Sequence, residues 1–456
     1  MMPRSDGWSW LRYMRHLLNS DPRIIESTFV FVESPAFFSA FSSAFNVENY
    51  TTAIANYVGL KALITLSPFL PAQHTFLYEF SYAYDVTDVD PQVVACSSLV
   101  EKLYPYGVGI AAKLTLNREF ANVHRTHYDA QLSALFNETR VVVRDLLQTG
   151  RSWFSNLDVK RAQRKLDNMT LAFGTTHNFV QYETYRKTPA QPLRSDTSVL
   201  STLVSIFRHS SSIYWNALDN AGGKTTLAYD NTYDTSVFDW NSEYQPTNNA
   251  VFIPNAAVGF LSFVSSRIPF QLYPVVVQLI LRAVLQALVW SNSLFDERMV
   301  PEKWWRGESV GEYENVTECL LRRYRAAGLQ DGHDERRPLV RYTVARREAD
   351  FLDNAVLRPL YQLYERALEK HNATRLFYRL PDRRVTLREL FFYNYAAAFC
   401  DGASEETRRV QEGLAITPAK LRVNVPLMNF PPFQRTFSCG DKEAHEPRCD
   451  VWKGLD

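Results

Sequence analysis

The segment Leu272-Tyr-Pro-Val-Val-Val-Gln-Leu-Ile-Leu-Arg-Ala-Val-Leu-Gln-Ala-Leu-Val-Trp290 is the one stretch of the chain that resembles a transmembrane helix. Its length is close to that of a membrane span. Three polar residues, Gln278, Arg282 and Gln286, interrupt it at a spacing of four, so they share one face of a helix. An arginine at the centre of a lone span costs about 2.5–3.5 kcal/mol. The pattern therefore favours a buried helix with a polar stripe facing a cavity, and a helical membrane protein is the alternative.

The composition of the 456-residue chain is that of an ordinary globular protein, with 46% hydrophobic and 22% charged residues, which excludes disordered and collagen-like classes. Its 50 basic and 49 acidic residues give no global argument for a nucleic-acid or membrane-surface partner. The arginine-rich segment 322–347 lacks interleaved stacking aromatics and indicates a solvated basic face. The N-terminus lacks the apolar region of a signal peptide, so we expect membrane attachment only through a segment absent from this chain.

Helical periodicity dominates the chain, and we predict a mainly α fold with a few short strands. Residues 210–247, rich in Gly, Asn and Asp, indicate a loop or an inter-domain segment, which divides the chain into parts 1–230 and 235–456. Asp158 is the predicted N-cap of one helix. The predicted strands are 24–32 and 251–254, and the predicted helices are 49–66, 93–116, 121–147, 158–173, 272–289, 310–327, 345–370 and 387–399.

An ordered series of short motifs in the second half resembles the neprilysin/endothelin-converting-enzyme family of zinc metallopeptidases. The motifs are Asn241-Ser-Glu-Tyr followed by Val251-Phe-Ile-Pro254, Glu302-Lys-Trp-Trp305, Asp353-Asn-Ala-Val-Leu357, Leu390-Phe-Phe-Tyr with Phe399-Cys400, Leu421-Arg-Val-Asn-Val-Pro-Leu427 and Cys449-Asp-Val-Trp452. The first half agrees more loosely. The resemblance implies a two-lobed, mainly helical ectodomain with a thermolysin-like C-terminal lobe. It also implies that the chain begins inside the family's N-terminal helical region.

In that family, two histidines of a His-Glu-x-x-His helix and a downstream glutamate hold zinc, and the glutamate of the motif is the general base. The flanking motifs place the two histidine positions at Arg282 and Gln286, the base at Ala283 and the third ligand at Ala349. Arginine stays protonated and cannot ligate a cation. The family's transition-state histidine falls on Ile416, whereas its aspartate beside the zinc ligands is retained as Asp353.

The resemblance therefore implies a metallopeptidase homologue that binds no zinc and is catalytically inactive. Glu348 does not rescue the site, because one position turns it about 100° around the helix. The nine histidines include only one close pair, His124 and His127, which lacks the glutamate. The alternative is an active zinc metalloendopeptidase cleaving oligopeptides, which would need a different register of the motif.

Two positions that bind the substrate backbone in the family are kept, as Asn241 and Arg422. They imply a cleft that could still hold a peptide, and the alternative is that Arg422 only ties down its own loop. Asp353 would be a costly unpaired charge without zinc. We therefore predict an ion pair between Arg282 and Asp353.

The five cysteines are an odd number, so at least one has no partner within the chain. The resemblance implies a disulfide between Cys319 and Cys449. The family partners of Cys96, Cys400 and Cys439 lie in a segment N-terminal to this chain. A disulfide indicates an oxidising compartment, so we expect an extracellular protein, either secreted or the ectodomain of an anchored one. Five glycosylation sequons, mildly in excess of chance, point the same way, at Asn49, Asn137, Asn168, Asn315 and Asn372.

Overall fold

The computed structural model describes residues 10–17, 25–26, 50–67, 125–149, 152–173, 201–208, 240–246, 249–254, 272–298, 302–329, 343–379, 383–400, 416–439 and 448–453, with single residues between some of these ranges. Contacts group the chain into two units, residues 1–105 with 178–230 and residues 106–177 with 231–456. The first unit contains α1 (Trp10–Leu17) and α3 (Tyr50–Leu66), and α3 confirms the predicted helix 49–66. The predicted strand 24–32 and most of the predicted helix 93–116 lie outside the described residues.

The second unit holds the candidate site and begins with α7 (Arg125–Gln148) and α8 (Asn156–Asp167), followed by β1 (Thr170–Phe173). Our sequence division placed residues 106–177 with the N-terminal part, but they group with the C-terminal part. The reason is packing, since α7 lies against the two central helices of this unit and β1 pairs with one of its strands. A division near residue 230 stays a prediction for the domains of the protein.

A three-stranded sheet has the order β1-β3-β2, with β2 spanning Glu243–Gln245 and β3 spanning Ala250–Ile253. β1 runs parallel to β3, and β2 runs antiparallel to it. The predicted helix 158–173 is wrong at both ends. Ser155, not Asp158, is the N-cap, and the helix ends at Asp167. Residues after it turn into β1 because the amide of Thr170 donates to the carbonyl oxygen of Asn249 (3.0 Å) and starts the parallel ladder.

The apolar segment that opened the sequence analysis is buried in this unit. It forms a π-helical turn, η4 (Tyr273–Val277), and then α12 (Gln278–Gln286), rather than one helix over 272–289. α12 ends early because the chain turns into the 3₁₀ segment η5 (Trp290–Leu294). There the side-chain amide of Asn292 donates to the carbonyl oxygen of Gln286 (2.8 Å). No helix in the part of the chain that the structure describes is long and apolar enough to cross a membrane.

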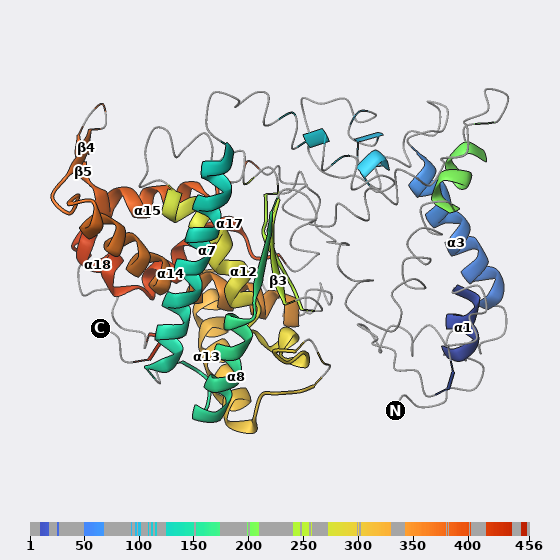
Figure 1. Cartoon of the computed structure of the whole chain (residues 1–456), viewed down its shortest axis with the longest axis horizontal. Helices are drawn as coiled ribbons and strands as arrows, with labels where there is room; N and C mark the ends of the chain where they lie inside the picture. Colours follow the sequence, from blue (N-terminus) through green and yellow to red (C-terminus); the bar gives the residue numbers. More distant parts are fainter. Residues whose placement is uncertain are drawn as a thin grey trace. The chain divides into compact units, whose positions relative to one another are not determined.

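Three longer helices complete the core of this unit, α13 (Gly307–Ala326), α14 (Val344–Lys370) and α15 (Leu387–Ala397). α12 packs against both α7 and α14, which also contact each other, and Figure 1 shows α12 beside β3. A hairpin of β4 (Phe377–Arg379) and β5 (Arg384–Thr386) precedes α15, and α17 (Ala419–Met428) and α18 (Pro431–Phe437) follow it. The predicted Cys319–Cys449 disulfide is confirmed, and it joins α13 to the C-terminal segment.

Candidate functional site

The centre of the candidate site is a single aspartate shared by two arginines. Asp353 lies on α14 with its side chain fully buried, and Arg282 of α12 and Arg422 of α17 both contact it. Arg282 donates through Nη1 to Asp353 Oδ1 and through Nη2 to the carbonyl oxygen of Ala349 (3.4 Å). The predicted Arg282–Asp353 ion pair is therefore confirmed, and it joins α12 to α14.

Arg422 makes a bidentate contact with the same carboxylate. Its Nε donates to Asp353 Oδ2 (2.7 Å) and its Nη2 to Oδ1 (3.1 Å), and the guanidinium lies over the ring of Phe399 at 4.9 Å. Burial by itself would lower the pKa of Arg422, but the charge and hydrogen bonds of Asp353 raise it overall. Arg422 thus holds α17 against α14, as the loop-tying alternative expects, while 29% of its side chain stays exposed.

The charge of this cluster is not balanced by the groups that face each other. Two guanidinium groups meet one carboxylate, which leaves a formal excess of one positive charge. Tyr395 of α15 packs against Phe399, the ring that Arg422 covers, with ring centres 5.3 Å apart. Burial and then the Asp353 charge raise the pKa of Tyr395, and both arginines oppose that rise. The Tyr395 side chain is fully buried, and its hydroxyl has no hydrogen-bond partner among the described residues.

The remaining positions that the motif resemblance assigns to the zinc site lie outside this cluster of charges. Ala283 is fully buried in the core. The Oε1 atom of Gln286 accepts a hydrogen bond from the backbone amide of Tyr244 (3.3 Å), which joins α12 to β2. Ile416 is 44% exposed. Two residues of the polar stripe of α12, Arg282 and Gln286, therefore meet partners on α14 and β2. The third, Gln278, is buried, and its Oε1 atom has no hydrogen-bond partner among the described residues.

Glu348 turns away from the arginine cluster, as its position on the helix predicts. Its carboxylate accepts hydrogen bonds from the amide (2.7 Å) and hydroxyl (2.6 Å) of Ser291, in the segment that follows α12. Burial raises the pKa of Glu348, and the two Ser291 hydrogen bonds limit that rise. Among the described residues, no three His, Cys, Asp or Glu side chains are close enough together to hold a metal ion. His124 lies outside the described residues, and the side-chain surroundings of His127 are not among those described.

Asn241 is exposed and lies two residues before β2, which is an edge strand of the described sheet. The structure thus gathers Arg282, Ala349, Asp353 and Arg422 at one point, whereas Gln286 bonds to β2 and Ile416 is exposed. An edge strand can pair with an extended peptide through its backbone.

A buried lysine close to α12 was missed by the sequence analysis. Lys165 of α8 donates from Nζ to the carbonyl oxygens of Asn292 (2.7 Å) and Phe295 (2.9 Å), and its ammonium lies 5.4 Å from the ring centre of Tyr244. Burial lowers the pKa of Lys165 to about 7, and Asp296 and Glu297 oppose that shift. The signal was present, because Lys165 is three residues after Ala162 on the apolar face of α8.

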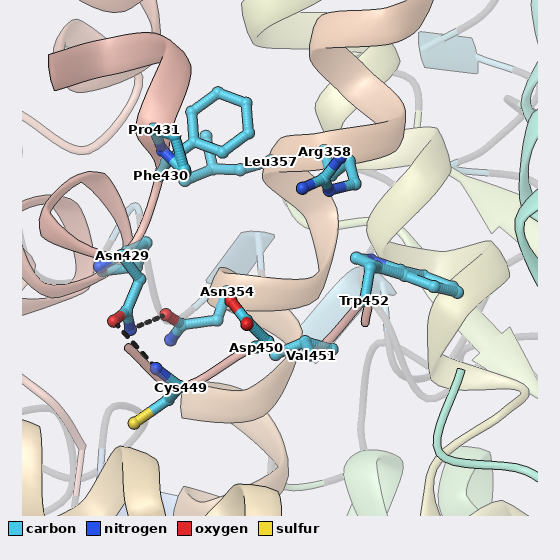
Figure 2. Close-up of a pocket in the computed structure, with 11 residues that line it drawn as sticks. Asn354, Leu357, Arg358, Asn429, Phe430, Pro431, Cys449, Asp450, Val451 and Trp452 are labelled. Atoms are coloured by element: carbon cyan, nitrogen blue, oxygen red, sulfur yellow. Dashed lines mark hydrogen bonds between the residues drawn. The ribbon is translucent and has the colours of Figure 1, made fainter. Parts of the chain in front are cut away.

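A small pocket lies between α14, the segment that joins α17 to α18, and the C-terminal residues from Cys449 to Trp452 (Figure 2). Its polar groups hydrogen-bond one another. The side-chain amide of Asn429 donates to Asn354 Oδ1 (3.0 Å), and the backbone amide of Cys449 donates to Asn429 Oδ1 (3.4 Å). Its volume of about 40 Å³ has room for water but not for a peptide side chain. We therefore assign it a structural role.

Comparison with known proteins adds to this geometry. A family model described as peptidase family M13 matches residues 241–451, and a second model with that description, for the N-terminal part, matches residues 2–176. Neprilysin-1 of Caenorhabditis elegans is 28% identical over 220 residues, which are 46% of this chain and 28% of that protein. Endothelin-converting enzyme 1 of Rattus norvegicus is 27% identical over 154 residues, 33% of this chain and 19% of that protein.

The fold has close parallels among solved structures. The zinc metalloprotease Zmp1 of Mycobacterium tuberculosis, determined in complex with an inhibitor, superposes with a TM-score of 0.63 at 15% identity. The superposition covers 91% of this chain and 60% of that one. The chain therefore spans less than two thirds of the length of the proteins that it matches.

Proposed function

Since this chain belongs to peptidase family M13, we propose that it is a family member that has exchanged its zinc centre for an arginine–aspartate cluster, and that it binds peptides without hydrolysing them. The observation that carries the proposal is the double salt bridge of Asp353 with Arg282 and Arg422. In this reading, the guanidinium of Arg282 takes over the role of counter-charge to Asp353. Neither an arginine nor an alanine can supply a metal ligand at the aligned positions.

The kept groups Asn241 and Arg422 support the peptide-binding part of the proposal. Asn241 precedes the edge strand β2, and Arg422 remains partly exposed while it contacts Asp353. We also propose that the protein works in an extracellular, oxidising environment, which the Cys319–Cys449 disulfide supports. The exposed Asn372, at the end of α14, is the sequon residue that we favour as a glycan acceptor.

Zinc content and hydrolysis test the absence of catalysis. We expect the purified chain, dialysed against zinc and then against buffer, to retain far less than one zinc per molecule by mass spectrometry. We also expect no chelator-sensitive cleavage of a fluorogenic peptide. Stoichiometric zinc with chelator-sensitive cleavage would instead identify a working metalloendopeptidase.

The register of the aligned positions has its own test. The quadruple change Arg282→His, Ala283→Glu, Gln286→His and Ala349→Glu rebuilds the three ligands and the base of the family motif. We expect this variant to bind one zinc, and a matched triple variant that keeps Ala349 to bind it more weakly. If the folded quadruple variant binds no more zinc than the unaltered chain, the register is wrong.

Peptide binding is tested separately by equilibrium dialysis against a library of random hexapeptides. We expect a subset of peptides to be retained, and the change Arg422→Met to reduce that retention. Retention of no peptide by the folded chain would contradict the peptide-binding part of the proposal. A result that does not change with Arg422→Met would show that Arg422 only ties α17 to α14.

A further inference from the structure

We infer that the Arg282–Asp353–Arg422 cluster is a binding site for a carboxylate group, so that the peptides bound by the protein are those that present a free carboxylate to it. This inference rests on the proposed function and names the chemical class of its ligand. It begins from the charge count, because one buried carboxylate faces two guanidinium groups. A single added carboxylate would balance that charge.

The donors needed for such a ligand are on the same atoms. Arg422 uses Nε and Nη2 on Asp353, and Arg282 uses Nη1 on Asp353 and Nη2 on the carbonyl of Ala349. Each guanidinium carries five N–H donors, so both have hydrogens beyond these contacts. The Arg282 side chain is 22% exposed and the Arg422 side chain is 29% exposed, so each reaches solvent while it contacts Asp353.

The hydroxyl of Tyr395 is an independent sign of a ligand at this place. Buried polar groups in folded proteins nearly always have a hydrogen-bond partner, and an exception needs an explanation such as a ligand or a water. Tyr395 is fully buried beside the three charged side chains, and its hydroxyl has no partner among the described residues. A bound carboxylate oxygen could accept from this hydroxyl.

The chemistry of the donors selects a carboxylate over other ligands. Arginine forks match the planar two-oxygen geometry of a carboxylate and form short, charge-assisted hydrogen bonds with it. A metal ion or an ammonium group would meet two positive charges. A phosphate dianion would reverse the excess charge instead of balancing it.

The test compares two probes that differ only in the carboxylate, N-acetyl-leucine and N-acetyl-leucinamide, by isothermal titration at low salt. We expect the acid to bind at least tenfold more tightly than the amide. The control Arg366→Gln changes an exposed arginine on α14, the helix that carries Asp353, and should leave this difference unchanged. Equal binding of the two probes, or binding of neither, would overturn the inference.

Two variants separate a binding role from a purely structural one. Asp353→Asn removes the negative charge and keeps the shape, so we expect it to tighten binding of N-acetyl-leucine severalfold, even though the fold is weakened. Tyr395→Phe removes the unpartnered hydroxyl, so we expect severalfold weaker binding with no loss of thermal stability. Unchanged carboxylate affinity in a folded Tyr395→Phe variant would contradict the inference.

Failure of this inference can be told apart from failure of the proposed function. If hexapeptides with free and amidated C-termini are retained equally in dialysis, and their retention still depends on Arg422, the protein binds peptides but the carboxylate site is wrong. If no peptide is retained while N-acetyl-leucine binds, the carboxylate site stands and the peptide function is wrong. A preference for free C-termini would support both.

Discussion

Asp353 is a buried carboxylate with two partners, and this redundancy governs what a single substitution can do. Removing either arginine leaves the other in contact with the carboxylate, whereas removing both leaves an unpaired buried charge. A charge of that kind costs about 3–5 kcal/mol. The two arginines are therefore expected to be strongly coupled in stability.

We expect Arg282→Met and Arg422→Met each to lower the free energy of unfolding by about 1 kcal/mol, and the double variant to lower it by about 3–5 kcal/mol. Urea denaturation of the four proteins gives the coupling energy directly. Arg144→Met, which breaks an exposed pair with Asp167, is the control and should change stability by less than about 0.5 kcal/mol. Additive effects of the two arginine changes would contradict a shared counter-ion.

Lys165 makes the stability of the second unit depend on pH. Its pKa is about 7 in the folded chain against 10.5 for the unperturbed group. Between these values the unfolded chain binds a proton that the folded chain does not, so the free energy of unfolding should rise with pH, by up to about 1.4 kcal/mol per pH unit. The neutral amine keeps two N–H groups, enough for its two carbonyl partners.

We expect Lys165→Met to flatten this rise, measured by urea denaturation at pH 7, 8.5 and 10. The control Lys160→Met changes an exposed lysine on the same helix and should retain the slope of the unaltered chain. Identical slopes in both variants would show that Lys165 keeps its proton across this range.

At the residue scale, the sequence could predict a contact only where an aligned motif named both partners. Arg282 with Asp353 is such a pair, because the family places a ligand beside that aspartate. The bidentate contact of Arg422 with Asp353 could not be predicted, since it depends on how α17 packs on α14. The burial of Lys165 could be predicted only from its place on the apolar face of α8, and a lysine on that face interrupts the apolar pattern.

Among the elements, α15 matters to the site because it carries Tyr395, and its start is fixed by a capping box. Thr386 Oγ1 accepts from the Glu389 amide (3.1 Å), and Glu389 Oε2 accepts from the Thr386 amide (2.6 Å). We expect Thr386→Ala to lower the free energy of unfolding by about 1 kcal/mol, measured in urea. Thr386→Ser keeps the hydroxyl and should lose much less, and equal losses would contradict a capping role.

The helices were predicted well and the strands poorly, for a physical reason. An amphipathic helix shows its period within a dozen residues, so α3, α13, α14 and α15 were placed to within a few residues. β1 has only four residues and exists because β3 pairs with it. Its partner is distant in sequence, and no local pattern in 170–173 records that pairing.

For the whole molecule, the Cys319–Cys449 bridge is the covalent constraint with the longest reach, with a sequence separation of 130. Loop entropy gives it roughly 5 kcal/mol, and removal of native disulfides costs about 2–5 kcal/mol. We expect the paired change Cys319→Ser and Cys449→Ser to lower the urea midpoint accordingly. Cys400→Ser, at an exposed free thiol, should leave the midpoint unchanged, and a midpoint that is the same in all three proteins would contradict the estimate.

Family membership was also readable at this scale, because the motifs occur in a fixed order along the chain. The grouping of residues 106–177 with the C-terminal part was not readable, since it rests on packing between segments far apart in sequence. The positions of the replaced zinc ligands remain a prediction from the motifs, and the variants described above test them.

The parallel pairing of Thr170–Phe173 with Ala250–Ile253 means that β1 has no partner strand until residues 250–253 have been synthesised. A ribosome delivers α7, α8 and β1 before β3, α12 and α14, against which α7 and β1 pack. Until then, the face of α7 that bears Leu132, Val142 and Leu147 stays uncovered, and β1 offers unpaired edges on both sides. Nascent chains that stop short of residue 250 should therefore be protease-sensitive and bound by chaperones, and protection should begin only as α12 and α14 emerge.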